Sequence, residues 1–124
     1  MAVPGAIAAG NRDLSVHFEG LANPTRLAIV EILARAGETG VSELARLCKV
    51  SQPRMSWHLR ILRLAEVITT RREGREVLCR LDRVAIDRHL QNFQRILDRG
   101  RSGAGVDVPL SDEAQPAPLS EGIL

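Results

Sequence analysis

The sequence predicts a mainly α-helical domain that carries one small β-hairpin, which is an α+β fold. Helical spacing of apolar residues and helix-capping residues mark successive segments along residues 11–99. Two short runs near residue 70 change to a strand-like pattern on either side of a Glu-Gly pair. A length of 124 residues suits one domain with a modest core.

A flexible arm and a first helix are expected at the N-terminus. Residues 1–10 are small and apolar and show no period, which predicts the flexible arm. Residues 11–21 are predicted to be helical from three apolar residues at helical spacing: Leu14, Phe18 and Leu21.

A second helix is predicted from Pro24 to about Ala36. Asn23 can cap the free N–H groups at its start, and proline is favoured at the first helical position because its missing N–H costs nothing there. Gly37 is expected to end this helix. The buried candidates are Leu27, Val30 and Leu33.

Two further helices are expected close together. Ser42 is predicted to cap a short helix over Glu43–Cys48, and Lys49-Val50 forms a tight connection. Ser51 is then predicted to cap a helix from Gln52 to about Leu64. Three apolar residues on one face of this helix are expected to pack inward: Met55, Leu59 and Leu62.

The hairpin follows directly. Strands are predicted over Glu66–Arg72 and Arg75–Leu81, with Glu73-Gly74 at the tip. The apolar strand positions are Val67, Val77, Leu78 and Leu81.

A last helix is predicted over Arg83–Arg99, with Gly100 ending it. Its apolar stripe has heptad-like spacing and, together with Phe18, is expected to form a dimer interface: Ile86, Leu90, Phe93 and Leu97. Residues 101–124 hold half of the six prolines and a net charge of −3, and they are expected to be a disordered acidic tail.

The composition excludes several classes of protein. No apolar run is long enough for a membrane span or a signal peptide. Two cysteines are too few for a disulfide framework, and the absence of tyrosine argues against a stacking platform for single strands. The sequence contains no nucleophile elbow, phosphate-binding loop or dinucleotide motif, so an enzyme is not expected.

The charge pattern predicts a surface that binds a polyanion. Residues 51–80 contain seven arginines and three acids, a net charge of +4. Two helices joined by a tight turn and followed by a basic hairpin describe a winged helix-turn-helix, whose second helix enters the major groove of DNA. The alternative is a helical hairpin with a polar surface. The predicted DNA-binding residues are Ser51, Gln52, Pro53, Arg54, Ser56, Trp57, His58, Arg60, Arg71, Arg72 and Arg75.

Three stretches resemble the ArsR/SmtB family of bacterial winged-helix repressors: LANPTRLAIVEIL, VSELARLCKVSQPRMSWHLRILRLAEVI and RREGREVLCRL. The similarity covers residues 14–99. It implies a homodimer assembled through the first and last helices, an inverted-repeat operator, and release by an inducer that is often a metal ion. It also places the DNA-reading positions on Gln52, Pro53, Ser56 and Trp57, and the wing on Arg71 to Arg75. Trp57 stands where smaller or more polar residues are usual.

The metal sites that the family uses do not carry over. One site needs two cysteines in an E-L-C-x-C segment, and the matching residues 43–47 have none. The ligand positions of the other site match Arg83, Ala85, Ile96 and Arg99 in this sequence. These two cations and two apolar side chains cannot replace oxygen and nitrogen ligands.

One unconventional metal site remains an alternative. If the first and last helices meet at the dimer interface, His17 and His89 would come together across subunits, near Asp87, in a site suited to nickel or zinc. The plainer interpretation is that all three are surface residues, and no cofactor is assigned.

The remaining expectations concern the two cysteines, a competing function and the cellular location. Cys48 and Cys79 are interpreted as structural thiols, with a redox switch as the alternative. A winged-helix module whose tail docks a co-repressor protein is the competing function. The protein is expected in the bacterial cytoplasm, without a membrane partner.

Overall fold

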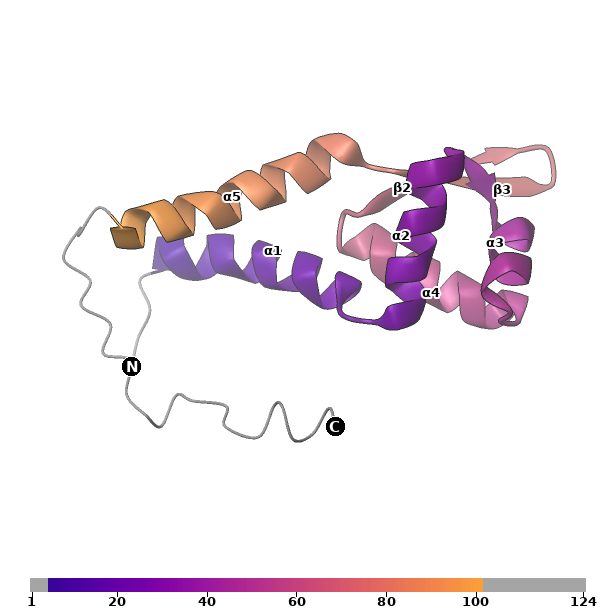
Figure 1. Cartoon of the computed structure of the whole chain (residues 1–124), viewed down its shortest axis with the longest axis horizontal. Helices are drawn as coiled ribbons and strands as arrows, with labels where there is room; N and C mark the ends of the chain where they lie inside the picture. Colours follow the sequence, from indigo (N-terminus) through magenta and orange to yellow (C-terminus); the bar gives the residue numbers. More distant parts are fainter. Residues whose placement is uncertain (1–4, 102–124) are drawn as a thin grey trace, which may run out of the picture.

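The computed structural model describes residues 5–101, with side chains from residue 11 onward. Figure 1 shows α2, α3, α4 and a small sheet gathered into one body, while α1 and α5 run side by side away from it. We call α1 and α5 together the stalk. The elements in chain order are α1 (Gly5–Leu21), α2 (Pro24–Ala36), β1 (Thr39–Gly40), α3 (Val41–Cys48), α4 (Gln52–Leu64), β2 (Ile68–Glu73), β3 (Glu76–Leu81) and α5 (Arg83–Arg101). The predicted fold class, mainly helical with a hairpin wing, is confirmed.

The apolar core lies inside the body and contains residues from every helix of it. Met55 and Leu62 on α4 are fully buried, and Leu59 is 4% exposed, so the predicted inward face of α4 is confirmed. A fully buried side chain of this size contributes about 1.5–3 kcal/mol to folding. The whole core cluster comprises Ile29, Leu33, Leu44, Ala45, Met55, Leu59, Leu62, Ala65, Val67, Ile68 and Cys79.

Helix α2 begins and ends where the sequence predicts. The Asn23 side chain accepts a hydrogen bond from the backbone N–H of Arg26 at 3.0 Å, and Gly37 caps the C-terminus with a φ of 80°. The prediction that Leu27 is buried is wrong, because Leu27 is 52% exposed. Ile29 takes that place in the core, since the buried face of α2 is rotated away from Leu27.

The start of α3 differs from the prediction. Ser42 lies inside the helix, and the N-cap is Gly40, which makes no side-chain capping bond. Thr39 and Gly40 pair with Cys79 and Leu78 of β3 as a two-residue strand, giving a sheet in the order β1-β3-β2. A strand this short has no detectable period in the sequence.

The wing hairpin is shifted by one residue from the predicted position. Glu73 pairs with Glu76, so the two-residue loop is Gly74-Arg75 rather than Glu73-Gly74. Gly74 has a φ of 65°, which a primed two-residue turn requires and glycine adopts without strain. The first strand begins at Ile68, because Glu66 is in the turn that ends α4.

Both stalk helices are longer than predicted. α1 begins at Gly5, so residues 5–10, assigned to the flexible arm, are helical. α5 runs through Gly100 to Arg101 instead of ending at Gly100, because a glycine stops a helix only where the chain turns away. The remainder of the predicted arm (1–4) and of the predicted tail (102–124) lies outside the described residues.

Gly20 brings the end of α1 against the end of α4. A Cβ atom built on Gly20 would lie 2.5 Å from the Cβ of Ala65, which is 2% exposed. Real Cβ atoms cannot approach so closely, so this crossing requires glycine. The stalk is therefore joined to the body by direct backbone packing.

Replacing Gly20 with alanine should separate the two helices. We expect Gly20→Ala to lower the free energy of unfolding by about 1–3 kcal/mol, the usual cost of overpacking. Urea denaturation followed by circular dichroism measures this change. The matched control is Gly100→Ala on α5, where an added Cβ meets nothing within 4 Å. Helix propensity predicts that this control gains about 0.5–1 kcal/mol, so equal losses in both variants would contradict the packing argument.

Candidate nucleic-acid interface

The outer face of α4 exposes a row of polar and aromatic side chains. Met55, Leu59 and Leu62 hold the opposite face in the core, which turns these residues toward solvent. Trp57 is 53% exposed, a large value for the only tryptophan of the chain. The predicted DNA-binding residues found exposed on or beside α4 are Ser51, Gln52, Pro53, Arg54, Ser56, Trp57 and Arg60.

Two side chains at the start of α4 fix the helix and its neighbour. The Ser51 hydroxyl accepts a hydrogen bond from the backbone N–H of Arg54 at 3.3 Å, which confirms the predicted cap. Gln52 donates through Nε2 to the hydroxyl of Ser42 on α3 at 2.9 Å. One N–H and the carbonyl oxygen of the Gln52 amide thus remain available to a ligand.

The helix-turn-helix connection is made by a left-handed residue. Lys49 has φ 58° and ψ 43°, and the N–H groups of Lys49 and Val50 bond to the carbonyl oxygens of Arg46 and Ala45. These bonds form a C-terminal cap that turns the chain directly from α3 into α4. The turn places the start of α4 beside α3.

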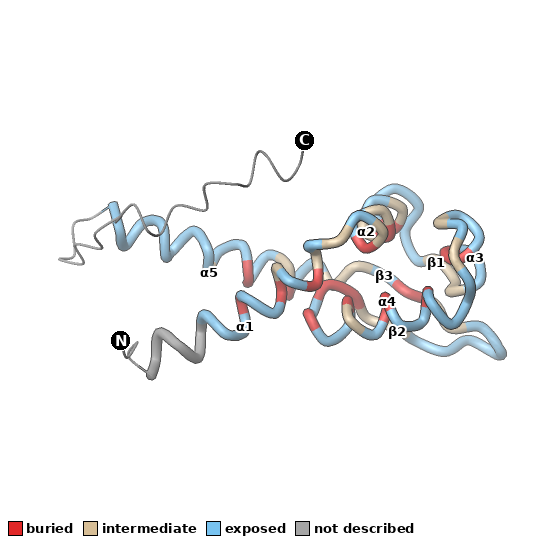
Figure 2. Tube along the Cα trace, turned by 90° about the horizontal axis from the view of Figure 1, so that it is seen from below, coloured by how far each residue is buried: buried red, intermediate tan, exposed pale blue. Residues whose placement is uncertain are grey.

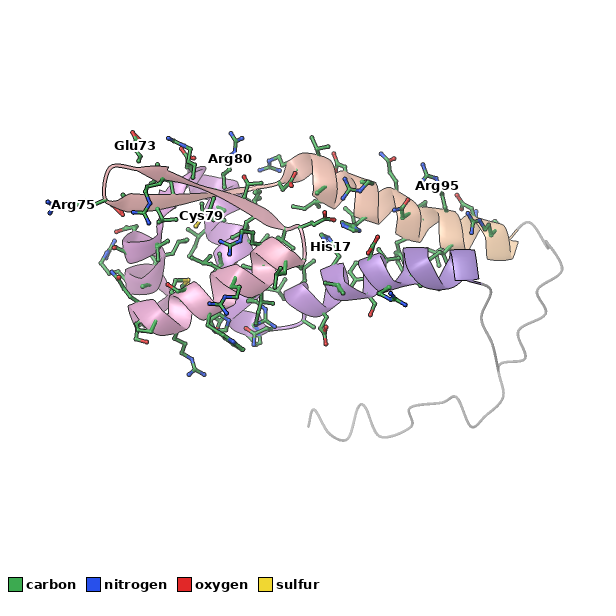
Figure 3. All side chains as sticks on the ribbon, turned by 180° about the vertical axis from the view of Figure 1, so that it is seen from behind. His17, Glu73, Arg75, Cys79, Arg80 and Arg95 are labelled. Atoms are coloured by element: carbon green, nitrogen blue, oxygen red, sulfur yellow. The ribbon has the colours of Figure 1, made fainter. Side chains whose placement is uncertain are left out.

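The arginines of the wing differ in their partners. Arg71 donates two hydrogen bonds of 2.8 Å to the carboxylate of Glu38 and one of 3.1 Å to Glu73. The hydrogen bond from Arg71 lowers the pKa of the Glu38 carboxyl. Arg72 and Arg75 are exposed and form no ion pair within residues 11–101, and Figure 3 shows Arg75 pointing away from the hairpin tip.

His58 does not lie on the outer face, where a DNA contact was predicted. Its ring is 3% exposed, and its Nδ1 lies 3.2 Å from Nη1 of Arg26 on α2. Burial, together with the charge of Arg26, lowers the pKa of His58. The correction has a simple cause: α2 covers this side of α4, and a helix-helix contact of this kind leaves no trace in the local sequence.

A pair of stacked histidines joins the stalk to the end of α4. The rings of His17 on α1 and His89 on α5 lie 4.1 Å apart between centroids with an interplanar angle of 19°. His17 donates through Nδ1 to the carbonyl oxygen of Ala65 at 2.7 Å, and His89 donates through Nε2 to the Glu66 carboxylate at 2.8 Å. Figure 3 shows His17 where α1 reaches the body.

This geometry corrects both interpretations of the histidines. His17 and His89 meet within one chain rather than across subunits, and they are 0% and 3% exposed rather than on the surface. Asp87 is exposed. Within the described part of the chain, no group of three or more histidine, cysteine or carboxylate side chains could hold a metal ion.

The two cysteines are both shielded. Burial raises the pKa of the Cys79 thiol to about 11, and it also raises the pKa of Cys48. A raised pKa lowers the fraction of reactive thiolate, which agrees with structural thiols.

The stalk exposes an apolar stripe along α5. Figure 2 colours exposed residues pale blue, and most of α5 has this colour. Leu90, Phe93 and Leu97 are 41–51% exposed, and Ile96, which was not among the predicted interface residues, is 40% exposed. Ile86 differs from the prediction because it packs against the core of its own chain. Phe18 is half-buried against Phe93, with ring centroids 5.3 Å apart.

Comparison with known proteins gives consistent matches. A family model of a helix-turn-helix domain matches residues 21–71. The HTH-type transcriptional repressor SmtB of Mycobacterium tuberculosis is 47% identical over 76 residues, which are 61% of this chain and 53% of that protein. The chain spans about half the length of the curated relatives that it matches first.

Solved structures share the fold. The homodimeric winged helix-turn-helix DNA-binding domain of Mb0332 from Mycobacterium bovis, a possible ArsR-family regulator, is 27% identical with a TM-score of 0.64, covering 81% of this chain and 93% of that one. An ArsR family transcriptional regulator, RHA00566, is 30% identical with a TM-score of 0.57, covering 71% and 93%. No helix within residues 5–101 is long and apolar enough to cross a membrane.

Two buried histidines whose pKa is lowered, His17 and His58, predict how stability depends on pH. Burial lowers the pKa of His17 below its ordinary value, so the unfolded chain binds more protons as the pH falls through about 6.5. We therefore expect the free energy of unfolding to decrease between about pH 7.5 and 5.5, by at most about 1.4 kcal/mol per pH unit for each of these two histidines. Urea titrations at fixed protein concentration measure it.

A replacement that cannot titrate isolates the contribution of His17. The pH slope should be shallower in His17→Gln than in the parent and unchanged in the control Asp87→Asn, which alters an exposed carboxylate on the same stalk. Equal slopes in all three proteins would contradict a neutral, buried His17.

Proposed function

This chain belongs to the ArsR/SmtB family of winged helix-turn-helix regulators, and from this premise we propose that it is a sequence-specific DNA-binding repressor acting as a homodimer. One observation carries the proposal: the polar outer face of α4 stands beside a wing whose Arg72 and Arg75 have no ion-pair partner in the described residues. A helix for the major groove and free cations for neighbouring phosphates are the two parts that duplex recognition needs.

The proposed contacts divide into base reading and phosphate binding. Gln52 is the base reader, because its amide oxygen and remaining N–H can pair with the edge of an adenine. Trp57 supplies an apolar surface for a thymine methyl group or a sugar. The phosphate contacts are assigned to Arg54, Arg60, Arg72 and Arg75. Ser51, Pro53 and Ser56 are placed near the sugar-phosphate backbone of the DNA.

Arg71 has a smaller proposed part than Arg72 and Arg75. Its guanidinium is already held by Glu38 and Glu73. A phosphate would have to replace these carboxylates, so little charge neutralisation is gained there. The Glu38 contact instead ties the base of the wing to the body.

The homodimer is proposed to form through the apolar stripe of the stalk. Leu90, Phe93, Ile96 and Leu97 follow one another at helical spacing on α5 and are each 40–51% exposed, and clustered exposed apolar side chains are typical of an interaction surface. The related domain from M. bovis is homodimeric. A twofold pair of such stalks would place two α4 helices on successive turns of an inverted repeat.

The remaining proposals concern enzymatic activity, cellular location and partners. The family and fold are those of DNA-binding regulators and not of enzymes. We place the protein in the cytoplasm, where its DNA is. No specific observation among the described residues favours a metal-responsive mechanism or a partner-docking module, and the segment assigned to a co-repressor lies within the undescribed residues 102–124.

Salt dependence tests the division between base readers and phosphate contacts. Measured by fluorescence anisotropy on DNA from upstream of its own gene, Arg75→Ala should weaken binding to this and to random DNA alike. It should reduce the slope of log affinity against log salt by about one. Gln52→Ala should leave the slope unchanged and cost about 1–3 kcal/mol on the specific site alone.

Two arginine controls sharpen this test. Arg71→Ala should change the slope less than Arg75→Ala, because Arg71 is already paired. Arg95→Ala removes a charge from α5, away from the wing, and should leave the slope unaltered (Figure 3). Equal effects of all three substitutions would mean that total charge, not the wing, governs binding.

A charge placed in the apolar stripe should disrupt the dimer. Leu97→Glu is expected to raise the dimer dissociation constant at least tenfold, about 1.4 kcal/mol, because a carboxylate would be buried without a partner. Sedimentation velocity over a concentration series measures this constant. Leu47→Glu on α3, at the opposite end of the molecule and 44% exposed, is the matched control and should stay dimeric (Figure 1). A dimeric Leu97→Glu protein would exclude this interface.

A further inference from the structure

Arg26 on α2 is a buried cation without an acidic partner. It is 8% exposed, and no carboxylate among the described residues pairs with it. Its Nε donates to the carbonyl oxygen of Gly20 at 2.6 Å, and its Nη1 lies 3.2 Å from Nδ1 of His58. Its guanidinium carbon lies 5.8 Å from the ring centroid of Trp57. Buried charges are ordinarily paired with an opposite charge, so this arrangement needs an explanation.

The three partners of Arg26 use different properties of the guanidinium. Its N–H groups donate to a carbonyl oxygen and to an imidazole nitrogen, while its positive charge lies over the indole ring as a cation–π contact. Because guanidinium only donates, His58 accepts at Nδ1 and carries its proton on Nε2. The rings of His58 and Trp57 also touch edge to face, with centroids 5.0 Å apart. We call Arg26, Trp57 and His58 the arginine cluster.

The arginine cluster connects the DNA-facing surface to the stalk. Trp57 and His58 belong to α4, Arg26 to α2, and the Gly20 carbonyl to the last turn of α1. The indole is 53% exposed, so one part of it packs inside the protein while the other part faces solvent. An exposed tryptophan without such packing would occupy several rotamers.

We propose that Arg26 is a positioning residue for DNA recognition, which holds the Trp57 indole in one orientation so that its exposed part makes a sequence-dependent apolar contact with a base edge. This inference rests on the proposed function, because it assigns the specificity of the same surface. Arg26 itself stays out of reach of the DNA bases and acts through the indole. Lysine cannot replace it, since an ammonium group lacks both the planar fork and the stacking face.

Trp57 makes the orientation directly measurable, because the chain has one tryptophan and no tyrosine. In the full-length protein without DNA, we expect Arg26→Lys to increase acrylamide quenching of the indole and to lower its fluorescence anisotropy. The matched control is Arg35→Lys on the same helix, an exposed arginine that pairs with Glu31 and should change neither signal. Unchanged indole signals in a folded Arg26→Lys protein would overturn the proposal.

The effect on recognition is measured with duplexes that the parent protein selects from a random pool. Arg26→Lys should lower the ratio of affinities for selected and random DNA about tenfold, which corresponds to about 1.4 kcal/mol. Affinity for random DNA and its salt slope should stay unchanged, because the substitution conserves charge. A loss of affinity that is equal on both kinds of DNA would overturn the positioning role.

A double-mutant cycle shows whether Arg26 acts through the indole. Trp57→Leu should lower the same ratio, and adding Arg26→Lys to it should lower the ratio little further. Full additivity of the two losses would place the action of Arg26 elsewhere. If the parent protein enriches no sequence at all, the proposed function fails, while the fluorescence result still decides whether Arg26 fixes the indole.

An observation on the unaltered protein covers the case in which the variants do not fold. Nitrogen chemical shifts of the histidine rings distinguish the two neutral tautomers. At neutral pH, His58 should be neutral with its proton on Nε2, because Nδ1 accepts from Arg26. A proton on Nδ1 would exclude the Arg26 contact and with it the proposal.

Discussion

The placement of α4 and of the side chains on its outer face depends on how this helix ends. Glu66 has a φ of 61°, and the N–H groups of Glu66 and Val67 bond to the carbonyl oxygens of Arg63 and Leu62, which is a left-handed helix cap at a residue other than glycine. Such a conformation costs a bulky residue about 1 kcal/mol or more. The Glu66 carboxylate offsets this cost by holding Arg88 and His89 of α5, each at 2.8 Å. The residue with the strained backbone is therefore the one that connects α4 to the stalk.

With its end fixed in this way, α4 cannot turn independently of the stalk. The residue before Glu66, the C-cap residue Ala65, accepts a hydrogen bond from His17 and packs directly on Gly20 of α1. At the other end of α4, Gln52 is tied to Ser42 of α3. The C-terminal end of α4 thus has a defined position relative to the stalk, whose α5 carries the apolar stripe, and its N-terminal end is held to α3. If two stalks associate, their geometry sets the separation of the two α4 helices, which an inverted repeat requires to be fixed.

The sequence predicts those features that arise from local chemistry. Asn23 before Pro24 and Ser51 before Gln52 cap their helices as expected, since a capping bond reaches only three residues along the chain. The positions of His58 and of the His17–His89 pair could not be predicted, because their partners on other elements lie 23 to 72 residues away in sequence. A histidine on a helix has the same local pattern whether it faces solvent or a neighbouring helix. The family resemblance supplies the fold and the recognition helix, but it names no partner for these buried side chains.

The described residues include four buried polar side chains: His17, Arg26, His58 and His89. Each of them joins a stalk helix to the body or joins α2 to α4. The core inside the body is apolar, and apolar contacts tolerate small shifts because they have no direction. Hydrogen bonds between buried polar groups are directional, and a displaced donor or acceptor loses its partner at a cost of about 1–3 kcal/mol. Polar groups at these junctions therefore add little net stability but make one relative orientation of stalk, α2 and α4 clearly preferred. If the protein binds DNA as the proposed homodimer, this defined orientation would matter more for the spacing of two α4 helices than a stronger contact would.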